Sequence, residues 1–285
     1  MKYYDLNNGM KIPALGLGVW QISDAEQCAD VISFTLQNGY SLIDTATVYQ
    51  NEAPVGEGIR RSCIPRDEIF VTSKLWMQDI GYERTVSAID RLLTRMGLDY
   101  LDMYLIHHPL GDYLGSWKAM EEARVAGKIR TIGVANFSAG QIRDIMAHSD
   151  TVPAVNQIEF HPLCQQKALC AFMAENHIQL EAWSPLGSGS KDLLNAPILT
   201  VMAEKYGKNA GQIILRWHMQ EGTVAIPKSV HEQRIRSNLD IWDFELTGQE
   251  MEQIRSMDTG KNMLGYDPEN PGQWKDFLVN MVVES

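Results

Sequence analysis

The sequence predicts a closed barrel of eight parallel strands, each followed by a helix. Short apolar runs alternate with amphipathic windows along the chain, a pattern typical of a parallel sheet covered by helices. Eight such units fit within 285 residues, and this length suits a (β/α)8 barrel better than an open doubly wound sheet. Glycines mark the ends of the helical windows, for example Asn38-Gly39, Gly97 and Gly127.

The eight strands are expected at apolar segments bounded by turn residues. They are Leu15–Val19, Ser41–Asp44, Ile69–Ser73, Leu101–Ile106, Thr131–Ala135, Ala154–Ile158, Gln179–Ala182 and Thr223–Ile226. Helical periodicity fills the intervals between them. The expected helices are Asp24–Gln37, Ala53–Ser62, Tyr82–Met96, Ser116–Ala126, Ala139–His148, Gln166–Asn176, Ile198–Tyr206 and Ala210–Gln220.

Both ends of the chain add elements to this repeat. Asn8-Gly9 predicts a tight turn between Tyr3–Leu6 and Lys11–Ala14, so residues 1–14 are expected to form a hairpin that plugs one end of the barrel. A further helix is expected at Gly248–Met257, followed by an extension, residues 258–285, over the barrel mouth. No linker or charge block divides the chain, which predicts a single domain over residues 1–285.

Composition excludes several classes of protein. Hydrophobic residues make up 45% of the chain, and the net charge is −11 (25 basic against 36 acidic residues), which disfavours a nucleic-acid partner. No apolar run is long enough for a membrane helix, and the N-terminus lacks the apolar segment of a secretory signal. The four cysteines have neither zinc-finger spacing nor the density of a disulfide scaffold, so a cytoplasmic protein is expected.

Polar residues follow nearly every predicted strand, where a barrel of this kind places its chemistry. Asp44, Tyr49, Lys74 and His107 form a coherent acid–base set. A nearby ammonium favours the tyrosinate and lowers the tyrosine pKa, and a carboxylate holds the ammonium in place. A neutral imidazole can orient a substrate carbonyl oxygen. This set suits carbonyl reduction, in which an alkoxide develops and needs a proton.

Three separated motifs resemble those of the aldo-keto reductase family. The segment Gly39-Tyr40-Ser41-Leu42-Ile43-Asp44-Thr45-Ala46-Thr47-Val48-Tyr49-Gln50-Asn51-Glu52 matches one family signature. Leu105-Ile106-His107 and Ile226-Pro227-Lys228-Ser229 match two more. The short loops are most similar to the bacterial, diketogluconate-reductase-like branch. The resemblance covers the chain from the hairpin to about Leu246.

The resemblance implies an NADP(H)-dependent oxidoreductase with Tyr49 as proton donor and Asp44, Lys74 and His107 completing a catalytic tetrad. The cofactor is expected to lie extended across the barrel mouth without a Rossmann domain. Gly16-Leu17-Gly18 agrees, because no third glycine completes a dinucleotide fingerprint. The implied cofactor residues on the nicotinamide side are Asn136 and Gln157 for the carboxamide, Trp183 for ring stacking, and Gly18, Val19, Ser184 and Leu186.

A cationic cluster is expected at the end of the last strand and the start of the next helix. Lys228, Ser229 and Arg234 combine fixed charges with a helix N-terminus, which suits an anion. In the family this cluster binds the 2′-phosphate of NADP(H), and Asn238 is placed at the adenine.

Aromatic residues are expected to line the pocket for a small-molecule carbonyl substrate and to give it broad specificity. They are Trp20, Trp76, His108 and Trp274. Three positions depart from the family pattern: Ala135 stands where Ser is frequent, His108 where Trp is common, and Ser237 where an acidic residue is frequent. These departures affect the expected cofactor grip and substrate choice and leave the tetrad intact.

Two other interpretations compete with a reductase. Some family members resemble channel subunits, so an NADPH-binding redox sensor or regulatory subunit is the alternative. His107-His108 and Glu159-Phe160-His161 raise the possibility of a metal-dependent barrel hydrolase. The His-x-His pattern of such hydrolases is missing at the first strand end, where Leu17-Gly18-Val19 stands, so no metal is expected. A monomer or weak dimer is expected.

Overall fold

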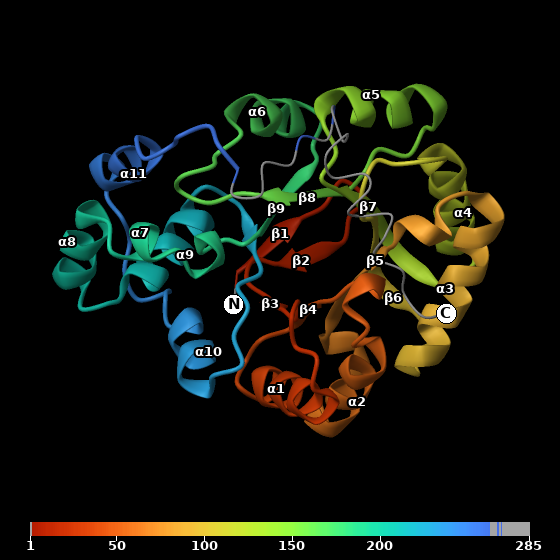
Figure 1. The fold of residues 1–285 in the computed structure, drawn as a ribbon, viewed down its shortest axis with the longest axis horizontal. Helices are drawn as coiled ribbons and strands as arrows, with labels where there is room; N and C mark the ends of the chain where they lie inside the picture. The colour runs from red at the N-terminus through yellow and green to blue at the C-terminus, as the bar shows by residue number, and fades with distance from the viewer. Residues whose placement is uncertain (1, 263–266, 268, 270–285) are drawn as a thin grey trace.

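Eight parallel strands form one sheet whose spatial order follows the sequence (Figure 1). The computed structural model describes residues 2–262, 267 and 269. The strands of the sheet are β3 Leu17–Gly18, β4 Leu42–Asp44, β5 Phe70–Leu75, β6 Leu101–Ile106, β7 Ile129–Ala135, β8 Val155–Glu159, β9 Gln179–Trp183 and β10 Val224–Ala225. Each strand pairs in parallel with its sequence neighbours, as the apolar runs predict.

The first and last strands also meet, so the sheet closes on itself. Leu15 pairs in parallel with Ala225. The Gly16 amide donates to the Ala225 carbonyl at 2.9 Å, and the Ala225 amide donates to the Ala14 carbonyl at 2.9 Å. Closure leaves no free sheet edge. The predicted (β/α)8 barrel is therefore confirmed.

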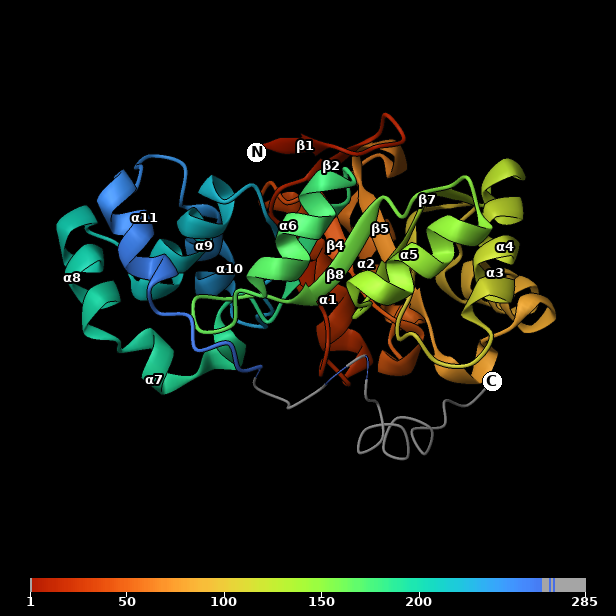
Figure 2. The same cartoon turned by 90° about the horizontal axis from the view of Figure 1, so that it is seen from above.

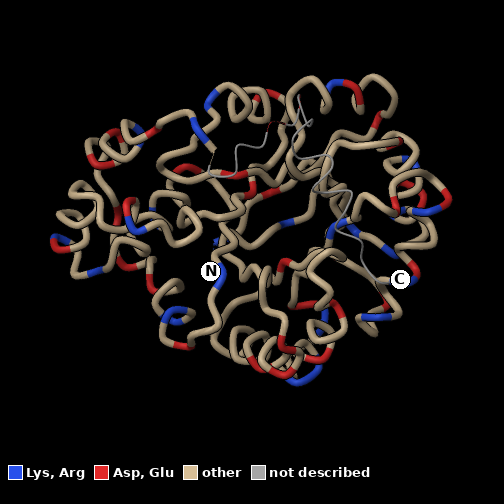
Figure 3. Tube along the Cα trace, viewed as in Figure 1, with Lys and Arg blue, Asp and Glu red and all other residues tan. Residues whose placement is uncertain are grey.

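Helices surround this sheet (Figure 1). They are α1 Ala25–Gln37, α2 Glu52–Ser62, α3 Tyr82–Met96, α4 Tyr113–Val125, α5 Ala139–His148, α6 Lys167–Glu175, α7 Lys191–Leu194, α8 Pro197–Tyr206, α9 Ala210–Gln220, α10 Glu232–Leu239 and α11 Gly248–Arg255. Their apolar residues recur at helical spacing on the inner face, as with Ala88, Leu92 and Met96 of α3, which are all buried. Basic and acidic residues lie mostly along the outer helices and loops (Figure 3).

The strands are buried on both faces, which explains their continuous apolar character. All six residues of β5 and all six of β6 are buried. One set of apolar side chains, including Leu42, Met103 and Leu105, forms a core cluster separate from the larger cluster that includes the helices. The interior of the sheet also holds the charged side chains of Asp44 and Lys74, and burying charges in this way requires that they be paired.

The N-terminal hairpin closes the end of the barrel at which the strands begin. Its strands, β1 Tyr3–Asp5 and β2 Lys11–Pro13, pair antiparallel around a turn in which Gly9 has a φ of 83°. Leu6 and Ile12 join the same core cluster as Leu42 and Phe70, the first residues of β4 and β5. Figure 2 shows the hairpin across one end of the molecule. The predicted plug is confirmed, and within residues 2–262 the hairpin leaves the carboxyl ends of the strands uncovered.

Several element boundaries differ from the prediction. The first strand is only two residues long. At the start of the predicted segment Leu15 forms only an isolated bridge, and at its end the Val19 amide donates to the Asp44 carbonyl from outside the strand. Helix α11 ends at Arg255 rather than at Met257. The short helix α7, which follows a turn at Gly187–Gly189, was not predicted. Most of the predicted extension, with Trp274, lies outside the described residues.

Among the described residues, no helix has the length and apolar character needed to cross a membrane.

Candidate active site

A cavity of about 910 Å³ opens at the carboxyl ends of the strands. Residues from all around the barrel line it, which places most of the sequence-predicted site in one space. Those lining residues are Gly18, Trp20, Asp44, Tyr49, Trp76, His107, His108, Asn136, Gln157, Trp183, Ser184, Leu186, Lys228, Ser229, Arg234 and Asn238. Lys74 lies directly behind this lining with no exposed surface.

A buried ion pair forms the floor of the cavity. Lys74 Nζ of β5 lies 2.6 Å from Asp44 Oδ1 of β4 and donates to the Thr45 carbonyl at 2.9 Å. Gln157 Nε2 of β8 donates to the other Asp44 oxygen at 2.9 Å. Burial disfavours the ammonium, but the Asp44 carboxylate outweighs it and raises the pKa of Lys74. Lys74 therefore keeps its positive charge inside the barrel, balanced by the Asp44 carboxylate.

Tyr49 lies above this pair at the end of a single 3₁₀ turn, Thr47–Tyr49. Its ring centroid is 5.2 Å from Lys74 Nζ. The turn is held by Glu52, which accepts from Thr47 Oγ1 at 3.2 Å and from Ser73 Oγ at 2.8 Å. Ser73 precedes Lys74 in β5, so one buried carboxylate fixes Tyr49 and Lys74 relative to each other.

The net effect on Tyr49 differs from the simple expectation. Burial raises the pKa of Tyr49, and the Lys74 ammonium lowers it only in part. From the sequence we expected only the lowering of the tyrosine pKa by the ammonium. The burial of Tyr49 could not be expected, because it depends on how the barrel closes around the turn. The phenol consequently stays protonated at neutral pH, as a proton donor must.

His107 and His108 form an aromatic wall with Trp76. The two imidazoles stack with centroids 4.8 Å apart and an interplanar angle of 9°, and the Trp76 ring meets His107 edge-on at 5.2 Å. Burial, with further contributions from His108 and Lys74, holds the pKa of His107 well below its usual range. Burial also lowers the pKa of His108 to about 3. Both rings are therefore neutral, and His107 Nδ1 has no hydrogen-bond partner among the described residues.

Side-chain amides and an indole continue the wall from β7 to β9. Asn136 adopts a left-handed backbone conformation, with a φ of 61°, directly after β7. Its Nδ2 donates to the His107 carbonyl at 3.1 Å, and its Oδ1 accepts from Trp183 Nε1 at 2.8 Å. This chain of bonds links His107, Asn136 and Trp183 into one fixed surface beside the tyrosine.

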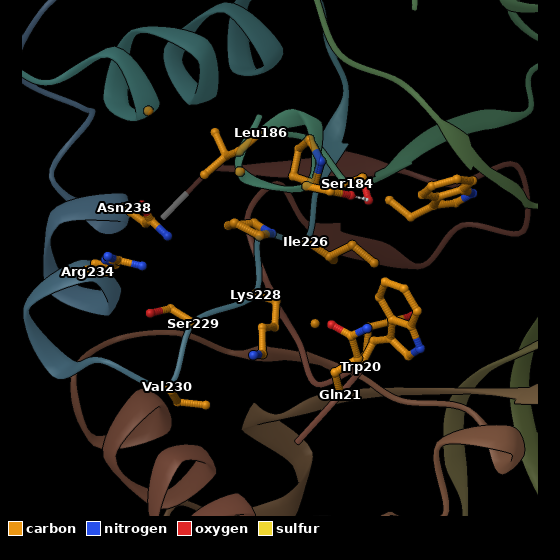
Figure 4. A pocket seen from close by; sticks show the side chains of 18 of the residues that line it. Trp20, Gln21, Ser184, Leu186, Ile226, Lys228, Ser229, Val230, Arg234 and Asn238 are labelled. Carbon is orange, nitrogen blue, oxygen red and sulfur yellow. Dashed lines mark hydrogen bonds between the residues drawn. The ribbon is translucent and has the colours of Figure 1, made fainter. Parts of the chain in front are cut away.

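The other end of the cavity carries positive charge. Figure 4 shows Lys228, Ser229, Arg234 and Asn238 on one side and Trp20 with Gln21 on the other. Lys228 and Arg234 are exposed, and neither forms an ion pair with a carboxylate among the described residues. Ser229 Oγ accepts from the His231 amide at 3.0 Å, just before α10. Two cations next to a helix start make an anion site.

Among the described residues, two of the predicted site residues, Lys74 and Val19, do not line the cavity. Val19 is fully buried and lies between two lining residues, Gly18 and Trp20, so its side chain is directed away from the cavity. Alternation along an extended segment could have revealed this. Trp274 lies outside the described residues.

Other lining residues were not predicted from the sequence. Asn209 begins α9 in a capping box with Gln212, and its Nδ2 donates to Ser237 Oγ at 2.9 Å. The Asn-x-x-Gln spacing was the available signal. Ser237 therefore contacts the cap of the neighbouring helix, and both residues line the cavity near the cations.

The histidines that suggested a metal site make other contacts in the structure. His161 Nε2 lies 3.0 Å from Glu159 Oε1, and both side chains are buried. Among the described residues, no three His, Cys, Asp or Glu side chains gather in a way that could hold a metal ion.

Comparisons with known proteins agree with this geometry. The model of the Aldo/keto reductase family matches residues 14–259. The chain is 49% identical to morphine 6-dehydrogenase of Pseudomonas putida, with 93% of each chain covered, and 46% identical to glyoxal reductase of Bacillus subtilis, with 88% of this chain and 91% of the relative covered. The crystal structure of a Bombyx mori aldo-keto reductase in complex with NADP is similar with a TM-score of 0.87 and 35% identity, covering 96% of this chain and 97% of that one.

Proposed function

Since the chain belongs to the aldo/keto reductase family and is an NADP(H)-dependent oxidoreductase, we propose that it reduces small aldehydes and ketones with Tyr49 as the proton donor. The observation that carries this proposal is the position of Tyr49. It lies over a buried Lys74–Asp44 pair, at the floor of a cavity whose far end holds two cations that form no ion pair with a described carboxylate.

The residues of the cavity fit the cofactor. Lys228 and Arg234 can bind the 2′-phosphate, because arginine offers a planar fork and lysine a point charge to such a group. Asn136 and Gln157 present side-chain amides at the opposite, buried end, where they can hold the nicotinamide carboxamide. Trp183 lies beside them and offers an aromatic face. When bound, NADPH supplies the hydride that reduces the carbonyl carbon.

The chain's own residues handle the substrate oxygen. The neutral imidazole of His107 donates a hydrogen bond that orients the carbonyl oxygen. The Tyr49 hydroxyl gives its proton to that oxygen as negative charge develops, and the bond between the tyrosine oxygen and its proton breaks. The Lys74 ammonium stabilises the resulting tyrosinate, and Asp44 keeps Lys74 charged and in place. Solvent then returns the proton to Tyr49.

The substrate side of the cavity is aromatic. Trp20 is 47% exposed at the rim, while Trp76 is almost completely buried against His107 and His108. Such walls accept many apolar or planar shapes, so we propose broad specificity for small carbonyl compounds, including dicarbonyls of the kind named in the glyoxal reductase relative.

The first experiment follows nicotinamide absorbance with purified protein, a cofactor and a carbonyl panel of glyoxals, aromatic aldehydes and sugar-derived ketones. We expect NADPH consumption well above NADH consumption. Tyr49→Phe should abolish turnover and retain NADPH binding, since only the proton donor is removed. Turnover that persists in Tyr49→Phe would contradict the assigned role. Saturable NADPH binding without turnover in the unmodified protein would favour the redox-sensor alternative.

A further inference from the structure

A second carboxyl group is buried behind the ion pair. Glu181 occupies the middle of β9, where it pairs with Gln157 of β8 and with Val224 of β10. Its side chain has no exposed surface, and neither carboxyl oxygen has a hydrogen-bond partner among the described residues. A carboxylate buried in this way is unfavourable, so the neutral acid is the stable form. No hydrogen bond among the described residues therefore explains why a carboxyl group is buried at this position.

Glu181 is connected to the tetrad through Gln157. Gln157 lies beside Glu181 in the sheet and donates to Asp44 Oδ2 at 2.9 Å, and Asp44 in turn holds Lys74. The titratable groups that face Glu181 are Asp44 of β4, Lys74 of β5 and Tyr49 of the following turn. The two flanking strands contribute only Gln157 and Val224, which do not titrate.

Charge at this position acts on all three groups. Burial and the Asp44 carboxylate raise the pKa of Glu181 to about 8, because the Lys74 ammonium offsets only part of the increase. A negative charge on Glu181 raises the pKa of both Lys74 and Tyr49. Glu181 therefore changes charge at a pH near 8.

We propose that Glu181 is a positioning residue of the active site. As a neutral acid behind Gln157, it keeps the buried cluster near zero net charge. When it ionises, its negative charge keeps Tyr49 protonated as the phenol. This role rests on the proposed function of Tyr49. In the oxidation of an alcohol, Tyr49 must act as the tyrosinate base, so ionised Glu181 delays the onset of oxidation to higher pH. At an effective dielectric constant of about 20, a unit charge several ångströms away moves a pKa by on the order of one unit.

The chain offers a matched control. Glu159 is also a buried carboxyl group, two residues after Gln157 on β8, but it is bonded to His161 at 3.0 Å and does not line the cavity. Glu159→Gln replaces a second buried carboxyl group on the neighbouring strand and leaves the Gln157–Asp44–Lys74 connection unchanged. The comparison separates a charge effect on Tyr49 from the general consequences of altering a buried acid.

The test is the pH profile of kcat for alcohol oxidation in the native chain, Glu181→Gln, Glu181→Leu and Glu159→Gln. We expect the limb on which oxidation rises with pH to move to lower pH by on the order of one unit in both Glu181 variants, since both remove the same charge. Glu159→Gln should follow the native curve. Unchanged profiles in the Glu181 variants, or an equal displacement in Glu159→Gln, would overturn the proposal. If Glu181→Leu does not fold, the pH profile of Glu181→Gln alone decides whether the proposal holds.

A second measurement needs no turnover and therefore separates this proposal from the proposed function. The folded pKa of Glu181 lies above the ordinary glutamate value of 4.5, so the native state retains a proton that the unfolded state loses. The stability that protonated Glu181 contributes at low pH is therefore lost as the pH rises towards about 8, the pKa of the buried carboxyl group. We expect the Tm of Glu181→Gln minus the Tm of the native chain to increase as the pH rises from about 5 to about 8. A constant difference would show that Glu181 does not hold the proton.

Discussion

The two ends of the cavity use charge in opposite ways. At the floor, Lys74 and Asp44 are fully buried, lie 2.6 Å apart and have their remaining bonds satisfied by Thr45 and Gln157. At the rim, Lys228 and Arg234 are exposed and form no ion pair with a described carboxylate. Buried charges are fixed before any ligand arrives, whereas exposed charges are screened until an anion binds. The floor therefore holds its charges in fixed positions, and the rim leaves its charges accessible to an anion.

The strongest test of this contrast is Lys74→Met. The substitution leaves Asp44 as a buried carboxylate without its cation, which we expect to reduce the free energy of unfolding by about 3–5 kcal/mol. Turnover should be lost as well, because nothing stabilises the tyrosinate. Urea denaturation and the nicotinamide assay measure the two effects.

The control for Lys74→Met is the double variant Asp44→Asn/Lys74→Met. It removes both charges, so stability should return in part while activity does not. A single variant as stable as the native chain would mean that the floor does not depend on this ion pair.

At the rim, Arg234→Ala should raise KM for NADPH by roughly tenfold, equivalent to about 1.4 kcal/mol, and leave kcat nearly unchanged. KM for NADH should not respond, because NADH lacks the 2′-phosphate. Arg236→Ala is the matched control, since Arg236 lies on the same helix, packs over the Phe34 ring and does not line the cavity. Equal losses for NADPH and NADH would contradict the assignment of Arg234 to the phosphate.

The smallest expected effect concerns a buried histidine behind the cavity wall. Burial lowers the pKa of His218 to about 3, against an ordinary value of 6.5, and its Nε2 lies 3.0 Å from the Pro185 carbonyl. As pH falls below 6.5, the unfolded state takes up a proton that the native state refuses, so stability falls. This one group should cost about 1 kcal/mol between pH 6.5 and 5.5.

His218→Asn should remove that part of the pH dependence in urea denaturation at the two pH values. His231→Asn is the control at the exposed rim and should leave the slope unchanged. If His218→Asn retains the native slope, the buried ring is not the group that resists protonation.

The strand positions could be predicted, and candidate site residues could be proposed at their ends, because both depend on local patterns. Leu101–Ile106 and Tyr82–Met96 are found at the predicted bounds, since continuous apolar runs and helical periodicity are readable in one dimension. The direction of the Tyr49 pKa could not be predicted, because it depends on burial by residues distant in sequence. Glu181 was missed for a related reason. The surroundings of a single acidic residue within a strand can be described only once the register of the neighbouring strands is known.

Closure of the sheet between Leu15 and Ala225 also has a consequence for the order of folding. This contact joins residues separated by most of the chain, and pairings of such high sequence separation form late because the intervening loop must first be closed. During synthesis, Asp44 and Lys74 emerge long before β10 and the cationic rim that follows it. A nascent chain therefore carries this ion pair in an incomplete sheet, and the cavity is complete only when the last strand docks against the first.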